Sequence, residues 1–300
     1  MDTQEHTGNL MKKGILALVI LNVIQASMGI FAREFNQHFD LFFQVFLRML
    51  AALIFSIIIF KKDIHFQKIT QLPIKEWKLI AIRAILMYIT GIAFITVAFI
   101  YGTFSNVAFI LSLPFTAIIG IPLLKQKITI PLIFVIALSF LGVVILSVEN
   151  FAEVAQFNIG SGFALIGSAS VALANLLRPK HGLELNNTEI GAVILFVATL
   201  LLGIISLVRG ENFIDINWSL GLVFLIAIAG ILNAILVIVT NFGFSIVKPI
   251  FANNILATKS IFGLLIGVLI YGEGIRVMDI LGGTVILGSL FLYNYLNSKS

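Results

Sequence analysis

Long apolar runs alternate with short polar interruptions along nearly the whole chain, starting at residue 13. A helix that crosses a bilayer needs about 20 mostly apolar residues. The pattern therefore predicts an all-α integral membrane protein with ten transmembrane helices and no soluble domain. The predicted helices are 13–32, 41–60, 78–98, 103–123, 129–148, 159–178, 189–208, 218–240, 246–270 and 275–296.

Composition supports this reading and excludes several other classes of protein. Hydrophobic residues make up 60% of the chain and charged residues 11%, whereas a soluble domain carries about 25% charged residues. The chain has no Cys, which excludes a disulfide scaffold and a thiolate metal site. Its four histidines fall in predicted tails or loops, so we expect no metal site, no cofactor and no proton relay within the membrane.

The distribution of positive charge predicts the orientation. Lys12 and Lys13 precede the first apolar run, which is longer than the core of a cleavable signal peptide. With the N-terminus in the cytoplasm, the outer loops receive only Arg33, Arg209 and Arg276 among the Lys and Arg residues. Lys/Arg bias sets membrane topology, so we expect both termini in the cytoplasm, as in a bacterial inner (plasma) membrane. The same scattered distribution argues against nucleic acid as a partner.

The two halves of the sequence resemble each other. Residues 121–129, at the end of the predicted fourth helix, correspond to residues 268–275, at the end of the ninth. Leu141-Gly142 and Leu287-Gly288 match at nearly the same offset. Because each half holds five helices, an odd number, the second must insert upside down, an arrangement common in transporters. The predicted organisation is a cytoplasmic tail (1–12), a first repeat (13–148) and a second, inverted repeat (159–296).

Four short motifs carry a resemblance to a known family. They are residues 27–33, Phe46-Leu47-Arg48, residues 108–114 and Tyr271-Gly272-Glu273. In their order and spacing the chain resembles the ten-helix, EamA-type branch of the drug/metabolite transporter superfamily. The resemblance implies secondary transport without ATP hydrolysis, of substrates that across the family include amino acids, nucleotide sugars, sugar phosphates and drugs.

The chain departs from the family pattern at two positions. Gln126 stands where the family usually has Glu, and Lys259 stands where the first half has Ser112. Lys259 and Arg48 are cations inside predicted helices. Insertion of such a group costs about 2.5–3.5 kcal/mol, and it usually faces the protein interior or a water-filled cavity.

Lys259 is therefore the leading candidate for contact with substrate. Its ammonium would attract a carboxylate or phosphate, and Asn254 and Thr258 lie beside it on a shared helical face. Two alternatives remain: Lys259 donates to backbone carbonyls of a neighbouring helix, or it is uncharged. Arg48 has three roles open: it contacts substrate, it snorkels to the membrane surface, or it ties helices together through backbone carbonyls.

The remaining intramembrane polar residues are weaker candidates. Helix–helix hydrogen bonds in membranes average only about 0.6 kcal/mol, so a single polar side chain says little. We select Gln25, Tyr88 and Asn175 as further possible substrate contacts, and we expect Arg83 to lie at the membrane interface.

Three functions compete at this point. The first is transport of a small anionic or zwitterionic metabolite, such as an amino acid. The second is export of hydrophobic or cationic drugs, which normally uses an intramembrane carboxylate; no acidic residue falls in a predicted helix centre. The third is a membrane enzyme or a sensor, but paired titratable groups and an output module are both missing from the pattern. The expected partners are a small-molecule substrate and the lipid bilayer, with the oligomeric state open.

The predicted orientation can be checked by labelling. Lys68→Cys introduces a single cysteine into a chain that has none, in a loop that we expect to be cytoplasmic because of its Lys content. An impermeant maleimide added to intact cells should leave this cysteine unmodified and should label it after permeabilisation. Equal labelling before permeabilisation would contradict the predicted topology.

Overall fold

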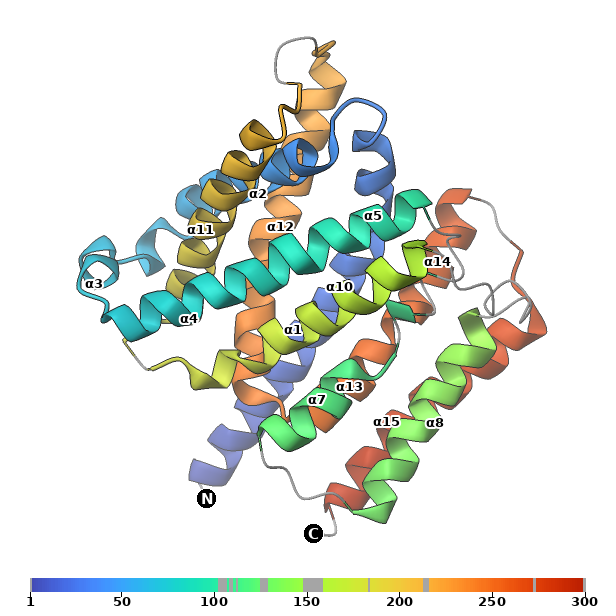
Figure 1. The fold of residues 1–300 in the computed structure, drawn as a ribbon. Coiled ribbons are helices and arrows are strands. Elements are labelled where there is room, and N and C mark those ends of the chain that lie inside the picture. Colours follow the sequence, from blue (N-terminus) through green and yellow to red (C-terminus); the bar gives the residue numbers. More distant parts are fainter. Residues whose placement is uncertain are drawn as a thin grey trace.

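The computed structural model describes residues 2–101, 107, 110–111, 113–124, 129–147, 159–182, 184–212, 216–271 and 274–298. Over these residues the regular structure is entirely helical (Figure 1). The long helices are α1 (Asp2–Phe35), α2 (Leu41–Ile59), α4 (Ile74–Ala84), η2 (Ile85–Ala93, a π-helical stretch), α5 (Phe94–Tyr101), α7 (Phe115–Leu123), α8 (Ile130–Ser147), α10 (Ile159–Leu176), α11 (Asn187–Val208), α12 (Leu220–Ile246), α13 (Pro249–Ala257), α14 (Lys259–Tyr271) and α15 (Val277–Ser298). Three short helices occupy the loops: η1 (Lys61–Asp63), α3 (Phe66–Thr70) and η3 (Arg178–Lys180).

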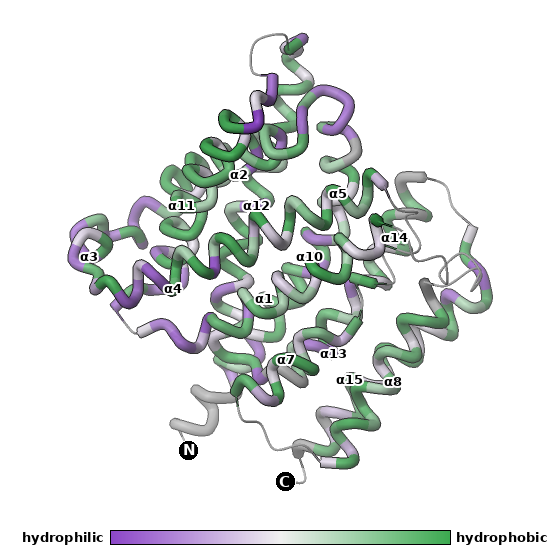
Figure 2. The backbone as a smooth tube through the Cα atoms, in the orientation of Figure 1, coloured by the Kyte–Doolittle hydropathy of each residue, from purple (hydrophilic) through white to green (hydrophobic). Residues whose placement is uncertain are grey.

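Six helical segments of the described chain are long and apolar enough to cross a bilayer. They are Asn9–Ala32, Leu41–Ile59, Ile74–Tyr101, Ile159–Lys180, Asn187–Val208 and Leu220–Ile246. Shorter apolar helices cover Ile130–Ile145, Phe251–Ile266 and Val277–Tyr293. The hydropathy of the chain follows this division, because the hydrophobic colour runs along the helices and the hydrophilic colour gathers at their ends (Figure 2).

The observed boundaries differ from the predicted ones at several helices: α4 begins at Ile74 rather than 78, and α12 ends at Ile246 rather than 240. Helix α1 begins at Asp2, well before residue 13. The predicted ninth helix, 246–270, is divided into α13 and α14 at Thr258. Part of the predicted fourth helix, 103–123, lies outside the described residues, and α7 forms its second part.

Local sequence explains several helix ends. Asn186 and Glu189 form a capping box at the start of α11, in which each side chain accepts from the other residue's backbone N–H. The hydroxyl of Ser219 accepts from the Leu222 N–H at the start of α12. Pro249 opens α13, a position where its missing N–H is not needed.

The two halves of the chain interlock helix by helix. Helices of the first half pack on helices of the second in five main contacts: α1 on α12, α2 on both α11 and α12, η2 and α5 on α10, and α8 on α15. The paired helices run in opposite directions, since Gly14 near the start of α1 lies at Val247, just after α12. Gly142 near the end of α8 likewise lies against Gly282 in the first part of α15.

Two glutamates of the α11 region hold α2 at both of its ends. At one end the Glu211 carboxylate accepts from the N–H groups of Phe42 and Phe43, at 3.1 and 2.7 Å. These N–H groups are among those that a helix start leaves without intrahelical partners. At the other end Glu189 accepts from the backbone N–H of His65 at 3.0 Å. The α2–α11 pair is therefore pinned as one unit.

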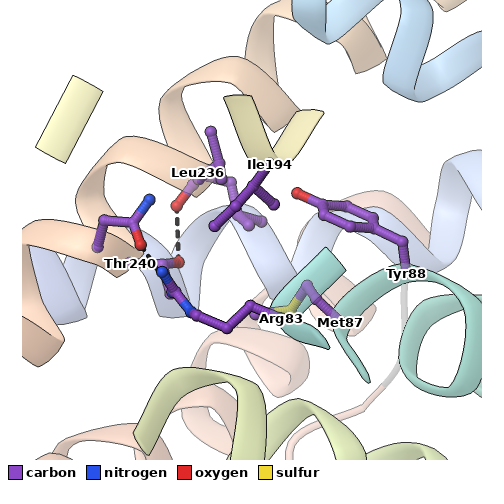
Figure 3. Close-up of a pocket in the computed structure, with 8 residues that line it drawn as sticks. Arg83, Met87, Tyr88, Ile194, Leu236 and Thr240 are labelled. Atoms are coloured by element: carbon purple, nitrogen blue, oxygen red, sulfur yellow. Dashed lines mark hydrogen bonds between the residues drawn. The ribbon is translucent and has the colours of Figure 1, made fainter. Parts of the chain in front are cut away.

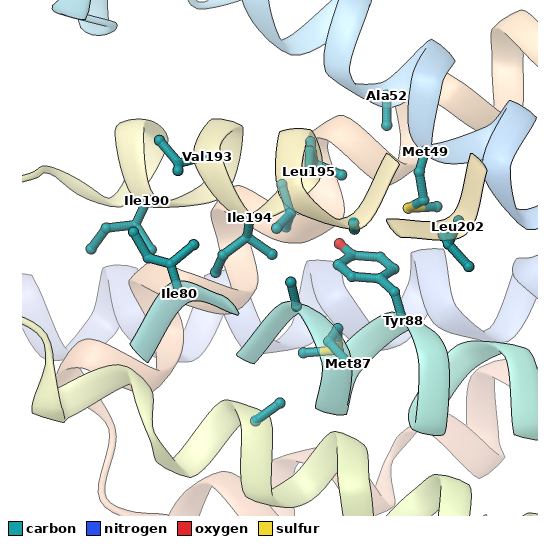
Figure 4. Packing of buried hydrophobic residues seen from close by; sticks show 14 of the residues in the cluster. Met49, Ala52, Ile80, Met87, Tyr88, Ile190, Val193, Ile194, Leu195 and Leu202 are labelled. Atoms are coloured by element: carbon teal, nitrogen blue, oxygen red, sulfur yellow. The ribbon is translucent and has the colours of Figure 1, made fainter. Parts of the chain in front are cut away.

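The largest apolar core lies between α2, α4, η2 and α11. Figure 4 shows Ile190, Ile194 and Leu202 of α11 facing Ile80 and Tyr88. Inside a bilayer such packing competes with lipid tails that are equally apolar, so close fit provides the stabilisation.

Gly230 offers a direct test of that close fit. A Cβ at Gly230 would stand 2.5 Å from the Ala51 Cβ and 2.9 Å from the Ala51 carbonyl carbon. Gly230→Ala should therefore force α2 from α12 and lower stability by about 1–3 kcal/mol, seen as a lower thermal unfolding midpoint in detergent. Gly221→Ala, on the same helix with only Ser219 Oγ near at 3.9 Å, is the matched control and should not lose stability. Equal midpoints for the two variants would contradict the packing described here.

Candidate functional site

Arg83 is the centre of a buried polar cluster that joins three helices. It is 2% exposed and donates from Nε to the Ala174 carbonyl of α10 at 2.9 Å. Its Nη2 donates to Asn241 Oδ1 of α12 at 2.7 Å, and its Nη1 lies 3.1 Å from His181 Nε2. Each nitrogen of the guanidinium thus meets an acceptor from a different element.

The cluster fixes the tautomer of His181. A guanidinium has only donors, so His181 Nε2 must accept from Arg83 and carry no proton. The proton then resides on Nδ1, which donates to Glu76 Oε2 at 2.7 Å. Glu76 also accepts from the Gly182 N–H at 3.0 Å. The neutral imidazole therefore relays between a cation and an anion that are not in direct contact.

A small pocket adjoins this cluster. It is lined by Arg83, Met87, Tyr88, Ile194, Leu236, Val237, Thr240 and Asn241. Figure 3 shows the Arg83 side chain extending toward α12 near Thr240, while the Tyr88 hydroxyl points back toward Ile194. The Thr240 hydroxyl is already used, since it donates to the Leu236 carbonyl at 2.7 Å. The pocket is apolar apart from the arginine end and the phenol.

Arg48 is buried like Arg83 but lacks comparable hydrogen bonds. It is 3% exposed, yet its Nε and Nη2 have no hydrogen-bond partner among the residues that the structure describes. Gln44, one turn earlier on α2 and fully buried, likewise has both amide atoms unpaired within the described chain. Arg48 and Gln44 lie on the side of α2 between two packed surfaces. Ala51 marks the surface that packs on α12, and Met49 marks the surface that packs in the core with Tyr88.

Lys259 lies at a break between two helices. The Asn22 amide of α1 donates to the Ile255 carbonyl at 2.6 Å and reaches the Thr258 hydroxyl at 2.9 Å. Lys259 is half-buried as the first residue of α14, with no hydrogen bond or ion pair to any described part of the chain. Ile261, about 200° further round the helix, packs with α8 and α15, so Lys259 points away from that pair.

The other predicted candidates are dispersed around these groups. Asn254 is fully buried in α13, and its amide has no partner within the described ranges. Asn175 is 3% exposed on α10 and follows Ala174, the acceptor of Arg83. Gln25 is half-buried on α1, one turn beyond Asn22. Ser112 lies outside the described residues.

The sequence pattern did not lead us to predict the cluster of hydrogen bonds around Arg83. We expected Arg83 at the membrane interface, but it is buried in protein because acceptors from α10 and α12 surround it. A signal was present, since Glu76 and Arg83 are seven residues apart and so share one helical face with opposite charges. The position of His181 had no such signal, because the fold alone brings this loop residue to α4.

Comparisons with known proteins place this geometry in context. A sequence model described as the EamA-like transporter family matches twice, over residues 12–148 and 158–295. A solved structure titled "Crystal structure of protein" superposes with a TM-score of 0.77 at 10% sequence identity, covering 96% of each chain. At that identity it shows the fold alone. A search of curated proteins gave no match.

Removing the charge of Arg83 and removing the charge of Arg48 should have different effects on the stability of the protein. Arg83→Met removes the central donor of a buried hydrogen-bonded cluster and should lower the stability by about 3–5 kcal/mol. Arg48→Met removes a buried charge that has no described partner, and replacing such a group with an apolar one is often neutral or stabilising, by up to about 4 kcal/mol. Thermal unfolding midpoints in detergent, without added ligand, measure both. A strong loss of stability in Arg48→Met would show that Arg48 is a structural tie.

Proposed function

The chain belongs to the EamA-like transporter family, within the drug/metabolite transporter superfamily, and we propose that it carries a small anionic or zwitterionic metabolite. An amino acid or a derivative of one is the expected kind of substrate. The protein is a multi-pass membrane protein of a transporter family, and the proposal concerns the sign of the substrate's charge. It rests on one observation: the buried Arg48 and the half-buried Lys259 are cations with no ion-pair partner among the described residues.

The argument is one of charge balance. An ionised group held away from water is costly unless it is paired. Neither Arg48 nor Lys259 has an ion-pair partner among the described residues, so an arriving carboxylate or phosphate would relieve a cost that the protein already bears. Arginine in particular suits a carboxylate, because its planar fork can donate two parallel hydrogen bonds.

The broken helix supports the same sign of charge. Substrate sites of many secondary transporters lie where a membrane helix is interrupted, with the positive end of a half-helix directed at an anionic group. Lys259 opens α14 immediately after the break at Thr258, so its charge adds to the partial positive charge of that helix start. Asn254, Thr258, Gln25, Tyr88 and Asn175 stay in the proposal as polar groups that orient the substrate.

We further propose that the two halves are inverted repeats of five helices each. The family model matches each half once. If α1 corresponds to α10, and α4, η2 and α5 together correspond to α12, then exchange of the halves turns the packing of α1 on α12 into that of α10 on η2 and α5. Under the same exchange the α2–α11 and α8–α15 pairs map onto themselves. We place the Lys-rich loops and both termini in the cytoplasm, and the substrate site at the interface of the halves.

Export of hydrophobic or cationic drugs is the alternative. It needs a carboxylate that is free to bind a cation within the membrane. The buried carboxylates of the described chain already have partners: Glu76 binds His181, Glu189 binds His65, and Asp279 binds Arg276 at 2.6 Å. This occupancy favours the anionic or zwitterionic substrate. A sensor or enzyme without transport is a third reading, and membership of a transporter family disfavours it.

Lys259 gives the sharpest test of the proposed substrate. Lys259→Met keeps a long apolar side chain and removes the charge. Loss of a charge-assisted hydrogen bond, about 1.5–3 kcal/mol, should reduce uptake of an anionic or zwitterionic amino acid into proteoliposomes by roughly tenfold to a hundredfold. Lys259→Arg should be intermediate, because a planar fork copies a compact ammonium poorly.

The control is Lys248→Met, which removes an exposed charge at the start of α13 and should retain wild-type uptake. Amounts of folded protein must be equal in all vesicles. A hydrophobic cation carried equally well by wild type and Lys259→Met would overturn the anionic proposal in favour of drug export.

A further inference from the structure

The Arg83 cluster joins helix ends that belong to different halves of the protein. Glu76 and Arg83 lie on α4 of the first half, whereas His181 follows α10 and Asn241 lies on α12 of the second half. These helix ends adjoin the Lys-rich loops, because α4 follows residues 61–73 and α12 ends two residues before Lys248. If α4 moves away from α10 and α12 during transport, the Arg83 cluster must break for the face with the Lys-rich loops to open.

Protonation of His181 and closure of the cluster exclude each other. Nε2 of His181 accepts from Arg83, which cannot give up a donor role, and Nδ1 already carries the proton given to Glu76. A second proton can enter only at Nε2. It would place an imidazolium N–H against a guanidinium N–H and break that contact.

We propose that His181 is a proton-binding site through which acidity of the cytoplasm opens the cytoplasmic end of the transporter. The inference rests on the proposed transport function, taken here to work by alternating access to the two faces of the membrane, and on the proposed orientation. The closed state holds His181 neutral, and the open state leaves the imidazole in contact with water. Protons therefore bind more strongly to the open state and shift the equilibrium toward it.

The groups around His181 agree with this direction. The pKa of His181 is lowered to about 4, mainly by burial and also by the nearby Arg83 and Arg178, while Glu76 opposes these effects. Lys75 is the other charge close to Glu76, and the facing group on α12 is the uncharged Asn241. All the charged groups around the imidazole other than Glu76 are thus cations, which disfavour a second proton in the closed state.

The expected shift between the closed and open states follows from the linkage between proton binding and opening. Once exposed, a histidine has a pKa of about 6.5. Closure is therefore fully favoured above about pH 6.5 and is lost progressively as the pH falls toward 4. Between about pH 7.5 and about pH 5.5 the open state gains about tenfold over the closed state, because it alone binds the proton.

A distance measurement tests this without any substrate. Spin labels on Lys78→Cys and Ser245→Cys, both exposed positions near the cluster on α4 and α12, report their separation in lipid nanodiscs by pulsed electron resonance. The wild-type background should show one short distance at pH 7.5 and a growing long-distance population at pH 5.5. An unchanged distribution over this range would overturn the proposal.

Two variants distinguish the effect of protonating His181 from the effects of other titrating groups. His181→Gln retains an oxygen for Arg83 and an N–H for Glu76 but cannot titrate, so it should stay closed at both pH values. His65→Gln, which alters the exposed histidine bound to Glu189, should keep the wild-type response. A response that persists in His181→Gln would assign it to another group and overturn the proposal.

A third variant covers the case in which His181→Gln does not fold. Glu76→Gln removes the anion that compensates Arg83, and it should raise the long-distance population already at pH 7.5. If Glu76→Gln kept the short distance at both pH values, the proposal that the Glu76–His181–Arg83 contacts hold the closed state would be contradicted. Because the labels report movement alone, a clear response together with absent uptake would refute the proposed transport and leave the proton site standing.

Discussion

Keeping a guanidinium away from water is costly, and this cost organises the interior of the molecule. Arg83 meets this cost with three acceptors, from α10, from His181 just after η3, and from α12, so its charge joins elements that are distant in sequence. Arg48 is buried to the same degree without a described partner. One arginine therefore stabilises a particular arrangement of helices, and we propose that the other binds an anion from outside the chain. The proposed gate and the proposed substrate site follow from that difference.

The remaining contacts divide the protein into a fixed part and a part that can move. Helices α2 and α11 are joined at both ends by Glu211 and Glu189, which accept from backbone N–H groups as well as side chains. A carboxylate that accepts several charge-assisted hydrogen bonds is hard to displace. The Arg83 cluster, by contrast, depends on a neutral histidine that one proton disrupts. Movement of α4 away from α10 and α12 is thus easier than separation of α2 from α11.

The helices were predictable because lipid leaves the backbone few alternatives: every N–H and C=O must be satisfied within the segment. For that reason α2 and α11 begin and end within two residues of the predicted positions. The break at Thr258 was not predictable from hydropathy, since residues 246–270 read as one continuous apolar run. At this break the Ile255 carbonyl accepts from the Thr258 hydroxyl and from the Asn22 amide of α1, and the second of these contacts is tertiary. The burial of Arg83 escaped prediction for the same reason, as its acceptors come from three other elements.

The sign of the charge that the interior accepts is the central claim, and ligand-induced stabilisation measures it most directly. A bound ligand raises the unfolding midpoint, and the rise grows with the ratio of ligand concentration to Kd. A panel of metabolites matched in size but differing in charge can therefore be compared on one purified sample. Compounds with a carboxylate or phosphate should stabilise the wild-type protein, and the effect should vanish in Arg48→Met combined with Lys259→Met. Stabilisation by hydrophobic cations alone, unchanged in that double variant, would contradict the account.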